Sequence, residues 1–223
     1  MLQKKAVAPE LLELLERLQR DPLTDRMLLV GGTALALQVS YRKSTDIDLF
    51  SFERFDTYQA SEHLIQDYGF EPRTLTKGAL IGFIGGIKVD LINHPYRWLA
   101  PSVIDGPFRL ASITDIAAMK MHAIANSGQR PKDFLDIAFL SRYFSYNQIK
   151  SFALQKYPNY DPIIMDKSII YFKDIDRASI EDIKMIGYKM DWDSVEERIF
   201  KMTDNPDKVF RYAPLKRIQP HTP

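Results

Sequence analysis

Three aspartates and a pair of glycines are the residues whose types and spacing suggest chemistry. The stretch LLVGGTALALQVSYRKSTDIDLF, residues 28–50, has Gly31 and Gly32 after an apolar run and Asp46 and Asp48 soon afterwards. Side chains on alternate residues of a strand point to the same face, so both carboxylates of the Asp-Ile-Asp triplet share a face. Like charges at that distance repel each other. We therefore expect either a cation between the two carboxylates or a strand face that is open to water.

The glycine pair and Thr33 are predicted to open a helix, because TALALQVSY combines helix-forming residues with an apolar face. The first N–H groups of a helix have no intrahelical acceptor, and the helix dipole adds partial positive charge at the same place. Phosphate is the natural ligand of such a turn. A plain tight turn without any ligand is the alternative at this point.

A third carboxylate follows in GIKVDLINH, where Asp90 shares a strand face with Lys88 and Ile92. If this strand pairs beside the strand of Asp46 and Asp48, three carboxylates meet at one place. Hard divalent cations such as Mg²⁺ prefer carboxylate and phosphate oxygens. The pattern is typical of two metal ions that stabilise the attacking and leaving oxygens of a phosphoryl displacement. Asp90 would then act as a metal ligand, as a general base, or as both.

A lysine and an aspartate lie on apolar helix faces in the second half of the chain. Lys120 interrupts an apolar helical stripe, and Asp136 shares a face with Phe139 and Leu140. An ammonium in such a place must reach water or find an anion, because an unpaired buried charge is costly. An ion pair between Lys120 and Asp136 would satisfy both groups without any ligand.

The elements that position these residues predict an α+β (α/β) fold with a mixed sheet. Apolar periodicity and glycine turns predict strands within 26–30, 45–52, 70–78, 79–86 and 87–94, and helices at about 9–20, 33–41, 56–68, 112–126, 131–144, 145–157 and 193–203. We predict a core with an N-terminal helix at residues 1–107. A helical region at 108–223 would pack on the core and complete a nucleotide site.

Composition excludes several classes of protein. The 223 residues include no cysteine and carry a formal net charge of +1. Disulfides and thiolate metal sites are excluded, and nothing in the global charge favours nucleic acids or anionic membranes. The N-terminal segment reads as an amphipathic helix and not as a signal peptide. No stretch approaches the roughly 20 apolar residues of a membrane span, so we expect a cytoplasmic protein.

Four motifs in order resemble a known family. Gly32 to Asp48, Lys88 to Asp90, AAMKMHAI around Lys120, and KDFLD (132–136) together resemble the nucleotidyltransferase superfamily. The closer resemblance within that superfamily is to the AbiEii/AbiGii toxin family, and it covers about residues 28–140. It implies a nucleotidyltransferase-like sheet core with flanking helices and a helical C-terminal half.

The resemblance also implies an activity and its residues. The reaction would be Mg²⁺-dependent transfer of a nucleoside monophosphate from an NTP to an acceptor hydroxyl, with two metal ions and with Mn²⁺ as the alternative ion. The implied catalytic residues are Asp46, Asp48, Asp90, Lys120 and Asp136, with the first three as metal ligands. The implied nucleotide-binding residues are Gly31, Gly32, Thr33, Lys88, Lys120, Lys132 and Asp133. Lys132 stands where relatives usually have arginine, so the bidentate fork is lost there.

The resemblance implies partners as well. Members act as toxins of toxin–antitoxin or phage-defence pairs, acceptors in relatives include tRNA 3′ ends, and a cognate antitoxin protein is expected. Two other functions stay open: a catalytically silent nucleotide-binding or regulatory protein on the same fold, and a transferase acting on a small molecule such as an antibiotic. A mildly basic tail leans slightly toward RNA as a partner, although the pattern itself favours a solvated chain end. Its basic residues are Lys201, Lys208, Arg211, Lys216 and Arg217.

Overall fold

The computed structural model describes residues 1–218 and divides the chain into two compact units. The first, the sheet unit, consists of Met1–Ser40 and Ser44–Ser112. The second, the helical unit, consists of Tyr41–Lys43 and the chain from Ile113 onward. Each unit is described by itself below.

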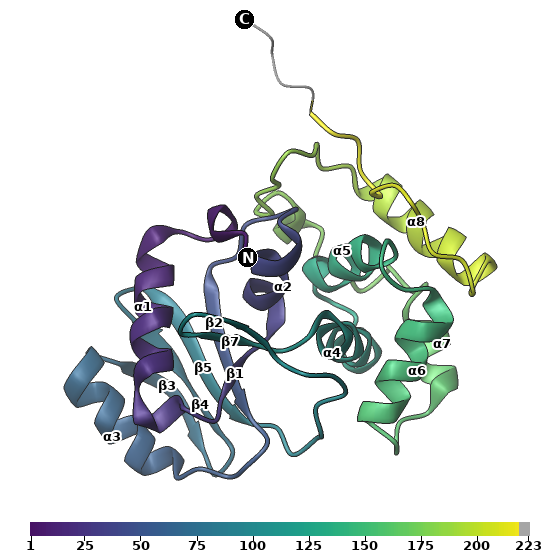
Figure 1. The fold of residues 1–223 in the computed structure, drawn as a ribbon. Coiled ribbons are helices and arrows are strands. Elements are labelled where there is room, and N and C mark those ends of the chain that lie inside the picture. The colour runs from purple at the N-terminus through teal and green to yellow at the C-terminus, as the bar shows by residue number, and fades with distance from the viewer. Residues whose placement is uncertain (219–223) are drawn as a thin grey trace, which may run out of the picture. The chain divides into compact units, whose positions relative to one another are not determined.

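The sheet unit contains a seven-stranded sheet (Figure 1). The sheet is mixed, as the sequence predicted, although two of its strands were not predicted. Its strands are β1 (Leu28–Leu29), β2 (Asp46–Ser51), β3 (Glu71–Thr76), β4 (Ala79–Ile84), β5 (Ile87–Asn93), β6 (Val103–Asp105) and β7 (Phe108–Leu110). The spatial order is β3-β4-β5-β2-β1-β7-β6. The β2–β5 and β1–β7 pairs are parallel, and the other pairs are antiparallel. Strands β2 and β5 therefore each have a neighbouring strand on both sides.

Three helices belong to the sheet unit: α1 (Pro9–Arg20), α2 (Gly31–Val39) and α3 (Thr57–Tyr68). Short 3-10 turns cover Lys4–Ala6 and Pro22–Thr24. Helix α1 contacts β2 and β7, and α3 contacts β3 and β4. Helix α3 has clear sequence signals at both ends, because the Asp56 side chain caps its first N–H groups and Gly69 ends it with a φ of +66°.

The sheet extends beyond the predicted core boundary. Residues 108–110 form β7, which pairs with β1, whereas the sequence placed the end of the core at Pro107. Strands β6 and β7 have three residues each, which is too short for an alternating pattern to be visible. The strand expected at 26–30 is likewise reduced to two residues, because Val30 already caps helix α2.

The helical unit is built around α4 (Ile113–Asn126), which contacts α5 (Pro131–Leu140), α6 (Tyr146–Lys156) and α7 (Pro162–Ser168). The remaining helices are α8 (Trp192–Asp204), which packs on α5, and a 3-10 turn at Ala178–Ile180. Helix α7 was not predicted from the sequence, because its seven residues show too little periodicity. Within residues 1–218, no helix is long and apolar enough to cross a membrane.

A short segment between α2 and β2 is packed in the helical unit. The Tyr41 ring stacks on Phe139 at a centroid distance of 4.0 Å. The Ile186 N–H donates to the Tyr41 carbonyl at 2.9 Å, and the Lys43 N–H donates to the Lys184 carbonyl at 2.8 Å. The chain therefore leaves the sheet unit for Tyr41–Lys43 and returns to it before the Asp-Ile-Asp triplet.

Candidate active site

The parallel pairing of β2 and β5 brings the predicted acidic residues onto one face. Asp48 lies opposite Asp90, and Asp46 lies opposite Lys88. Strand β2 alternates strictly between buried and half-exposed residues, and Ile47 belongs to the fully buried set. Because paired residues of neighbouring strands point the same way, the three carboxylates share one face, on which Asp46 and Asp48 are half-exposed and Asp90 is buried. The strand pairing that the sequence made conditional is therefore present.

The glycine turn lies directly against Asp48. Gly31 has a φ of +67°, and a Cβ placed on it would lie 2.3 Å from Asp48 Oδ2. The Val30 N–H donates to the Asp48 carbonyl at 2.9 Å, which ties the turn to β2. Valine has no side-chain acceptor, so the start of α2 has no capping side chain. Gly31 is therefore required both by backbone conformation and by the approach of this carboxylate.

Thr33 is buried and holds the start of β2. Its hydroxyl donates to the Asp46 backbone carbonyl, and the Thr33 hydroxyl oxygen lies 2.9 Å from Ser44 Oγ. The side chain has no exposed surface. The predicted nucleotide contact of Thr33 is thus not available to its hydroxyl, and any such contact would come from the backbone N–H.

Lys88 and Asp90 form an ion pair on β5. Lys88 Nζ lies 2.5 Å from Asp90 Oδ2, with exposed side-chain fractions of 39% and 12%. The other oxygen, Asp90 Oδ1, is buried and has no hydrogen-bond partner. An unsatisfied buried carboxylate oxygen is unfavourable, because it has lost its water without gaining a donor. This oxygen is therefore a candidate contact for a cation or a proton donor.

The chemistry of this face fits Mg²⁺ or Mn²⁺. All donors are carboxylate oxygens, and Mg²⁺ is usually bound by one or two carboxylates together with substrate phosphates and water. Asp48 and Asp90, whose Oδ1 has no hydrogen-bond partner, meet that requirement. In the described part of the chain, no three acidic or histidine side chains are already gathered closely enough to hold an ion by themselves. The site therefore fits an ion that substrate oxygens help to coordinate.

The second group of predicted residues forms a buried charge network inside the helical unit. Lys120 Nζ lies 2.5 Å from Asp133 Oδ1 and 2.8 Å from Asp136 Oδ2. Arg42 donates to Asp136 through Nε at 2.7 Å and through Nη2 at 2.8 Å, and the Tyr41 hydroxyl also donates to this carboxylate. Asp136 is completely buried. The Lys120–Asp136 ion pair that needs no ligand is therefore present, and it is part of a larger network.

The network shifts the pKa of each of its central groups. Burial by itself would raise the pKa of Asp136, but the charges of Arg42 and Lys120 outweigh it and lower that pKa well below its usual range. Burial would lower the pKa of Lys120, but Asp133 and Asp136 outweigh it and raise that pKa. Lys120 is thus held as an ammonium and Asp136 as a carboxylate.

Sequence reasoning missed two buried residue pairs. Arg42 is 2% exposed, and its partner Asp136 is 94 residues further along the chain. Lys156 and Asp115 form a second buried ion pair at 2.9 Å. The only sequence signal for either pair is an acidic residue on an apolar helix face, which indicates a cation without identifying it.

The sequence of the chain decides its family. Residues 13–75 and 81–212 match the family described as "Nucleotidyl transferase AbiEii toxin, Type IV TA system". The chain belongs to the AbiEii nucleotidyltransferase toxin family. It is therefore a member of a transferase family, and the resemblance seen in the four motifs is confirmed.

This chain has a relative in Aquifex and a similar fold to two proteins of Helicobacter. An uncharacterised protein of Aquifex aeolicus (strain VF5) is 31% identical over 191 residues, which cover 83% of this chain and 90% of the relative. A crystal structure of an H. pylori protein provisionally assigned as a nucleotidyltransferase covers 90% of this chain and 96% of its own, with a TM-score of 0.52 and 17% identity. The structure of JHP933 from Helicobacter pylori gives 0.52 and 15%, covering 90% and 93%. These two structures support a nucleotidyltransferase fold.

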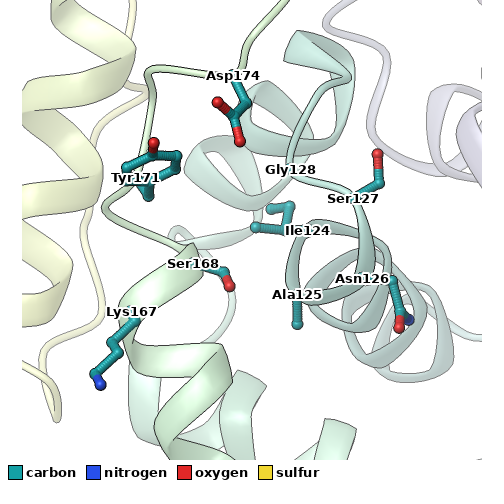
Figure 2. Close-up of a pocket in the computed structure, with 9 residues that line it drawn as sticks. All are labelled: Ile124, Ala125, Asn126, Ser127, Gly128, Lys167, Ser168, Tyr171 and Asp174. Carbon is teal, nitrogen blue, oxygen red and sulfur yellow. The ribbon is translucent and has the colours of Figure 1, made fainter.

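The AbiEii chain has surface hollows in its helical unit. One of about 190 Å³ lies between the end of α4 and the end of α7, and Figure 2 shows Tyr171 and Asp174 on one side of it and Asn126 on the other. None of the predicted site residues lines this hollow. Lys132 lines a hollow of about 320 Å³ together with Arg130. Asp133 lines a third hollow, of about 220 Å³.

Proposed function

We propose that this chain transfers a nucleoside monophosphate from an NTP to an acceptor hydroxyl and requires Mg²⁺. The observation that carries the proposal is the carboxylate face of β2 and β5, with Asp48 opposite Asp90 and with Gly31 against Asp48. Acidic side chains in register on neighbouring central strands repel one another unless a cation joins them. Membership of a nucleotidyltransferase family supports nucleotidyl transfer as the reaction that this cation assists.

Asp46, Asp48 and Asp90 would hold the ions, with Asp48 and Asp90 as the closest pair by register. When bound, Mg²⁺ supplies positive charge that neutralises the triphosphate oxygens as negative charge builds up on them. The two-ion count follows from the family resemblance and from the presence of three acidic residues. The unpartnered Asp90 Oδ1 supports a ligand or proton-accepting role for this residue.

The proposed step forms one bond and breaks one. The acceptor oxygen attacks the α-phosphorus, the bond from that phosphorus to the oxygen bridging to the β-phosphate breaks, and pyrophosphate leaves. The acceptor's proton passes to Asp90, whose Oδ1 has no competing donor. The remaining work is positioning, because in-line geometry alone removes a large part of such a barrier.

The start of α2 is proposed as the binding site for a phosphate of the nucleotide. Helix α2 lacks a capping side chain, and its first turn carries partial positive charge. Gly31 and Gly32 allow close approach of a ligand to the backbone, and Thr33 contributes through its N–H while its hydroxyl holds β2. The glycine turn thus acts through its backbone.

In the helical unit we propose different roles for residues inside and outside the charge network. Lys120, Asp133 and Asp136 are satisfied by Arg42 and by one another, so they position helices α4 and α5. Lys132 is half-buried beside Arg130 at a hollow, which favours phosphate contact as a point charge.

The proposed biological role is that of a toxin with a protein antitoxin in a toxin–antitoxin or phage-defence pair. The family description, which names a Type IV toxin–antitoxin system, supports this role. An RNA 3′ end is the proposed acceptor, with the 3′ end of tRNA as the first to be tested. The carboxylate face is common to any acceptor hydroxyl, so the experiment must include a small-molecule acceptor too.

The test is a transfer assay with the full chain, Mg²⁺, each of the four labelled NTPs, and either total tRNA or a panel of aminoglycosides. We expect label on tRNA with the parent protein. Asp48→Asn should reduce transfer by at least about 100-fold, the scale for removing one group that stabilises transition-state charge. Asp25→Asn, an exposed aspartate of the same unit, is the matched control and should retain parental transfer.

Each other outcome has a definite meaning. Label on aminoglycosides alone would assign a small-molecule transferase. A melting temperature raised by Mg²⁺ and NTP without transfer to any acceptor would favour a nucleotide-binding regulatory protein, since a ligand of the native state stabilises it. Equal transfer by Asp48→Asn and the parent would remove the carboxylate face from the reaction.

A further inference from the structure

Lys88 is the resident cation of the proposed metal face. Its ammonium lies 2.5 Å from Asp90 Oδ2, within the same strand and on the same face. Asp90 is 12% exposed in its side chain, so this is a partly dehydrated contact and stronger than a surface pair. One oxygen of the proposed ligand is therefore already neutralised by the protein itself.

The neighbours of Lys88 on this face are all acidic or apolar. Across the β2–β5 pairing it lies opposite Asp46, while Asp90 lies opposite Asp48. Across the β4–β5 pairing it lies opposite Phe83. A divalent ion that joins Asp48 to Asp90 would therefore sit beside an ammonium of the same sign, and the two cations would repel each other.

We propose that Lys88 is an internal counter-ion that a divalent cation displaces from Asp90, and that the freed ammonium then binds a phosphate of the incoming nucleotide. This inference rests on the proposed function of the same face. Lys88 is 39% exposed in its side chain, and lysine carries its charge on a flexible stem. The ammonium can therefore leave Asp90 without any change in the backbone of β5.

The displacement couples the two ligands. Without nucleotide, an ion between Asp48 and Asp90 repels the Lys88 ammonium from Asp90 and leaves Asp46 as its one acidic neighbour across the strand pair. With nucleotide, the displaced ammonium gains a phosphate, so each ligand strengthens binding of the other. The carboxylate face would then bind its metal weakly without a triphosphate, so that little metal is bound in the absence of substrate.

The inference makes a prediction in which removal of a charge strengthens metal binding and weakens coupling. Mn²⁺ is the probe, and free Mn²⁺ is measured by electron paramagnetic resonance during titration of the full chain, with and without an ATP analogue whose α–β bridge is a methylene group. A titration without protein gives the Mn²⁺ that the analogue binds by itself, and this is subtracted. In the parent we expect the analogue to tighten Mn²⁺ binding by roughly 5–150-fold, the usual range of coupling between two ligands. In Lys88→Met we expect tighter binding of Mn²⁺ alone and a coupling factor close to one.

Controls separate charge from fold. Lys77→Met removes the same charge from the exposed β3–β4 turn of the same unit and should behave like the parent. Lys88→Gln removes the charge but keeps a hydrogen-bond donor for Asp90, and it replaces Lys88→Met if the melting temperature of the latter falls. For both variants at position 88, the measured quantity is the affinity for Mn²⁺ and not the transfer activity.

The possible results are distinct. Failure of every variant, including the parent, to bind Mn²⁺ would overturn the metal face and with it the proposed function. If the parent and the two uncharged variants, Lys88→Met and Lys88→Gln, bind Mn²⁺ with the same affinity and the same coupling, only the role of Lys88 is overturned. Weaker Mn²⁺ binding without the charge would also overturn it, because Lys88 would then be orienting Asp90 for the metal.

Discussion

Gly31→Ala tests whether the placement of Asp48 matters, because the structure separates two costs of this substitution. The first is backbone strain, since Gly31 has a φ of +67°. A non-glycine residue in this region costs roughly 1–2 kcal/mol of folding free energy. The second is a collision with Asp48. The new Cβ would lie 2.3 Å from Oδ2 where at least 3.0 Å is normal, so that oxygen must retreat by 0.7 Å or more, the difference of the two.

This displacement of the Asp48 carboxylate should change the unfolding free energy little and lower the transfer rate strongly. Asp48 Oδ2 is the far end of a side chain that can rotate, so we expect little destabilisation beyond the backbone strain. A reacting group misplaced by about 1 Å can cost on the order of 100-fold in rate. We therefore expect Gly31→Ala to lose about 1–2 kcal/mol of unfolding free energy and about 100-fold in transfer.

Gly69→Ala is the matched control, because Gly69 has nearly the same φ, +66°, and nothing within 4 Å of its added Cβ. Urea unfolding should give similar losses for the two variants, while the transfer assay should give a loss for Gly31→Ala only. Transfer by Gly31→Ala within a few-fold of Gly69→Ala would refute the reasoning, since the position of the Asp48 carboxylate would then be irrelevant.

Two further predictions concern the buried network. Asp136→Leu should lower the unfolding free energy by about 3–5 kcal/mol in urea titration, because Arg42 and Lys120 lose a shared buried anion. Glu197→Leu, which breaks an exposed pair with Lys201 in the same unit, should stay within about 1 kcal/mol, and equal losses would contradict the network. The pH dependence follows from the pKa shifts: the lowered pKa of Asp136 stabilises the fold above the ordinary value of 3.8 and this is lost as the pH falls below it, whereas the raised pKa of Lys120 stabilises below 10.5 and this is lost as the pH rises above it. Urea unfolding from pH 2 to 11 should show both declines, and an unchanged acid limb in Asp136→Leu would count against this assignment.

The placement of the acidic residues on one face could be predicted from the sequence because the signals for it are local. Alternation at period two determines which side chains of a strand share a face: Asp46 and Asp48 are both half-exposed beside the buried Ile47, and Lys88 and Asp90 form an ion pair on one face of β5. The glycine turn and the closure of α3 by Gly69 are likewise local, since each needs a positive φ. Local signals could not decide that β2 and β5 are neighbours, and this pairing was only a hypothesis until the sheet order was known.

Contacts between distant residues are where the sequence was silent. Nothing around Arg42 distinguishes it from an exposed arginine, and its partner Asp136 lies 94 residues away. Lys88 shows a milder form of the same problem. The sequence put it on the face of Asp90 and assigned it to the nucleotide, but the pattern cannot say which of two anions holds an ammonium in the absence of ligand.

The same network changes how variants of Lys120 must be interpreted. The sequence left two roles for this lysine, contact with a nucleotide phosphate or pairing with Asp136, and it treated the pair as isolated. In the structure Asp136 keeps both Arg42 hydrogen bonds when Lys120 is removed, whereas Asp133 loses its one close cation. A transfer defect in Lys120→Ala would therefore mix any lost phosphate contact with the cost of a stranded Asp133 carboxylate. A double-mutant cycle with Asp133→Asn separates the two, because the second substitution removes that stranded charge. Restored folding without restored transfer would identify a phosphate contact, and restoration of both would identify a purely structural lysine.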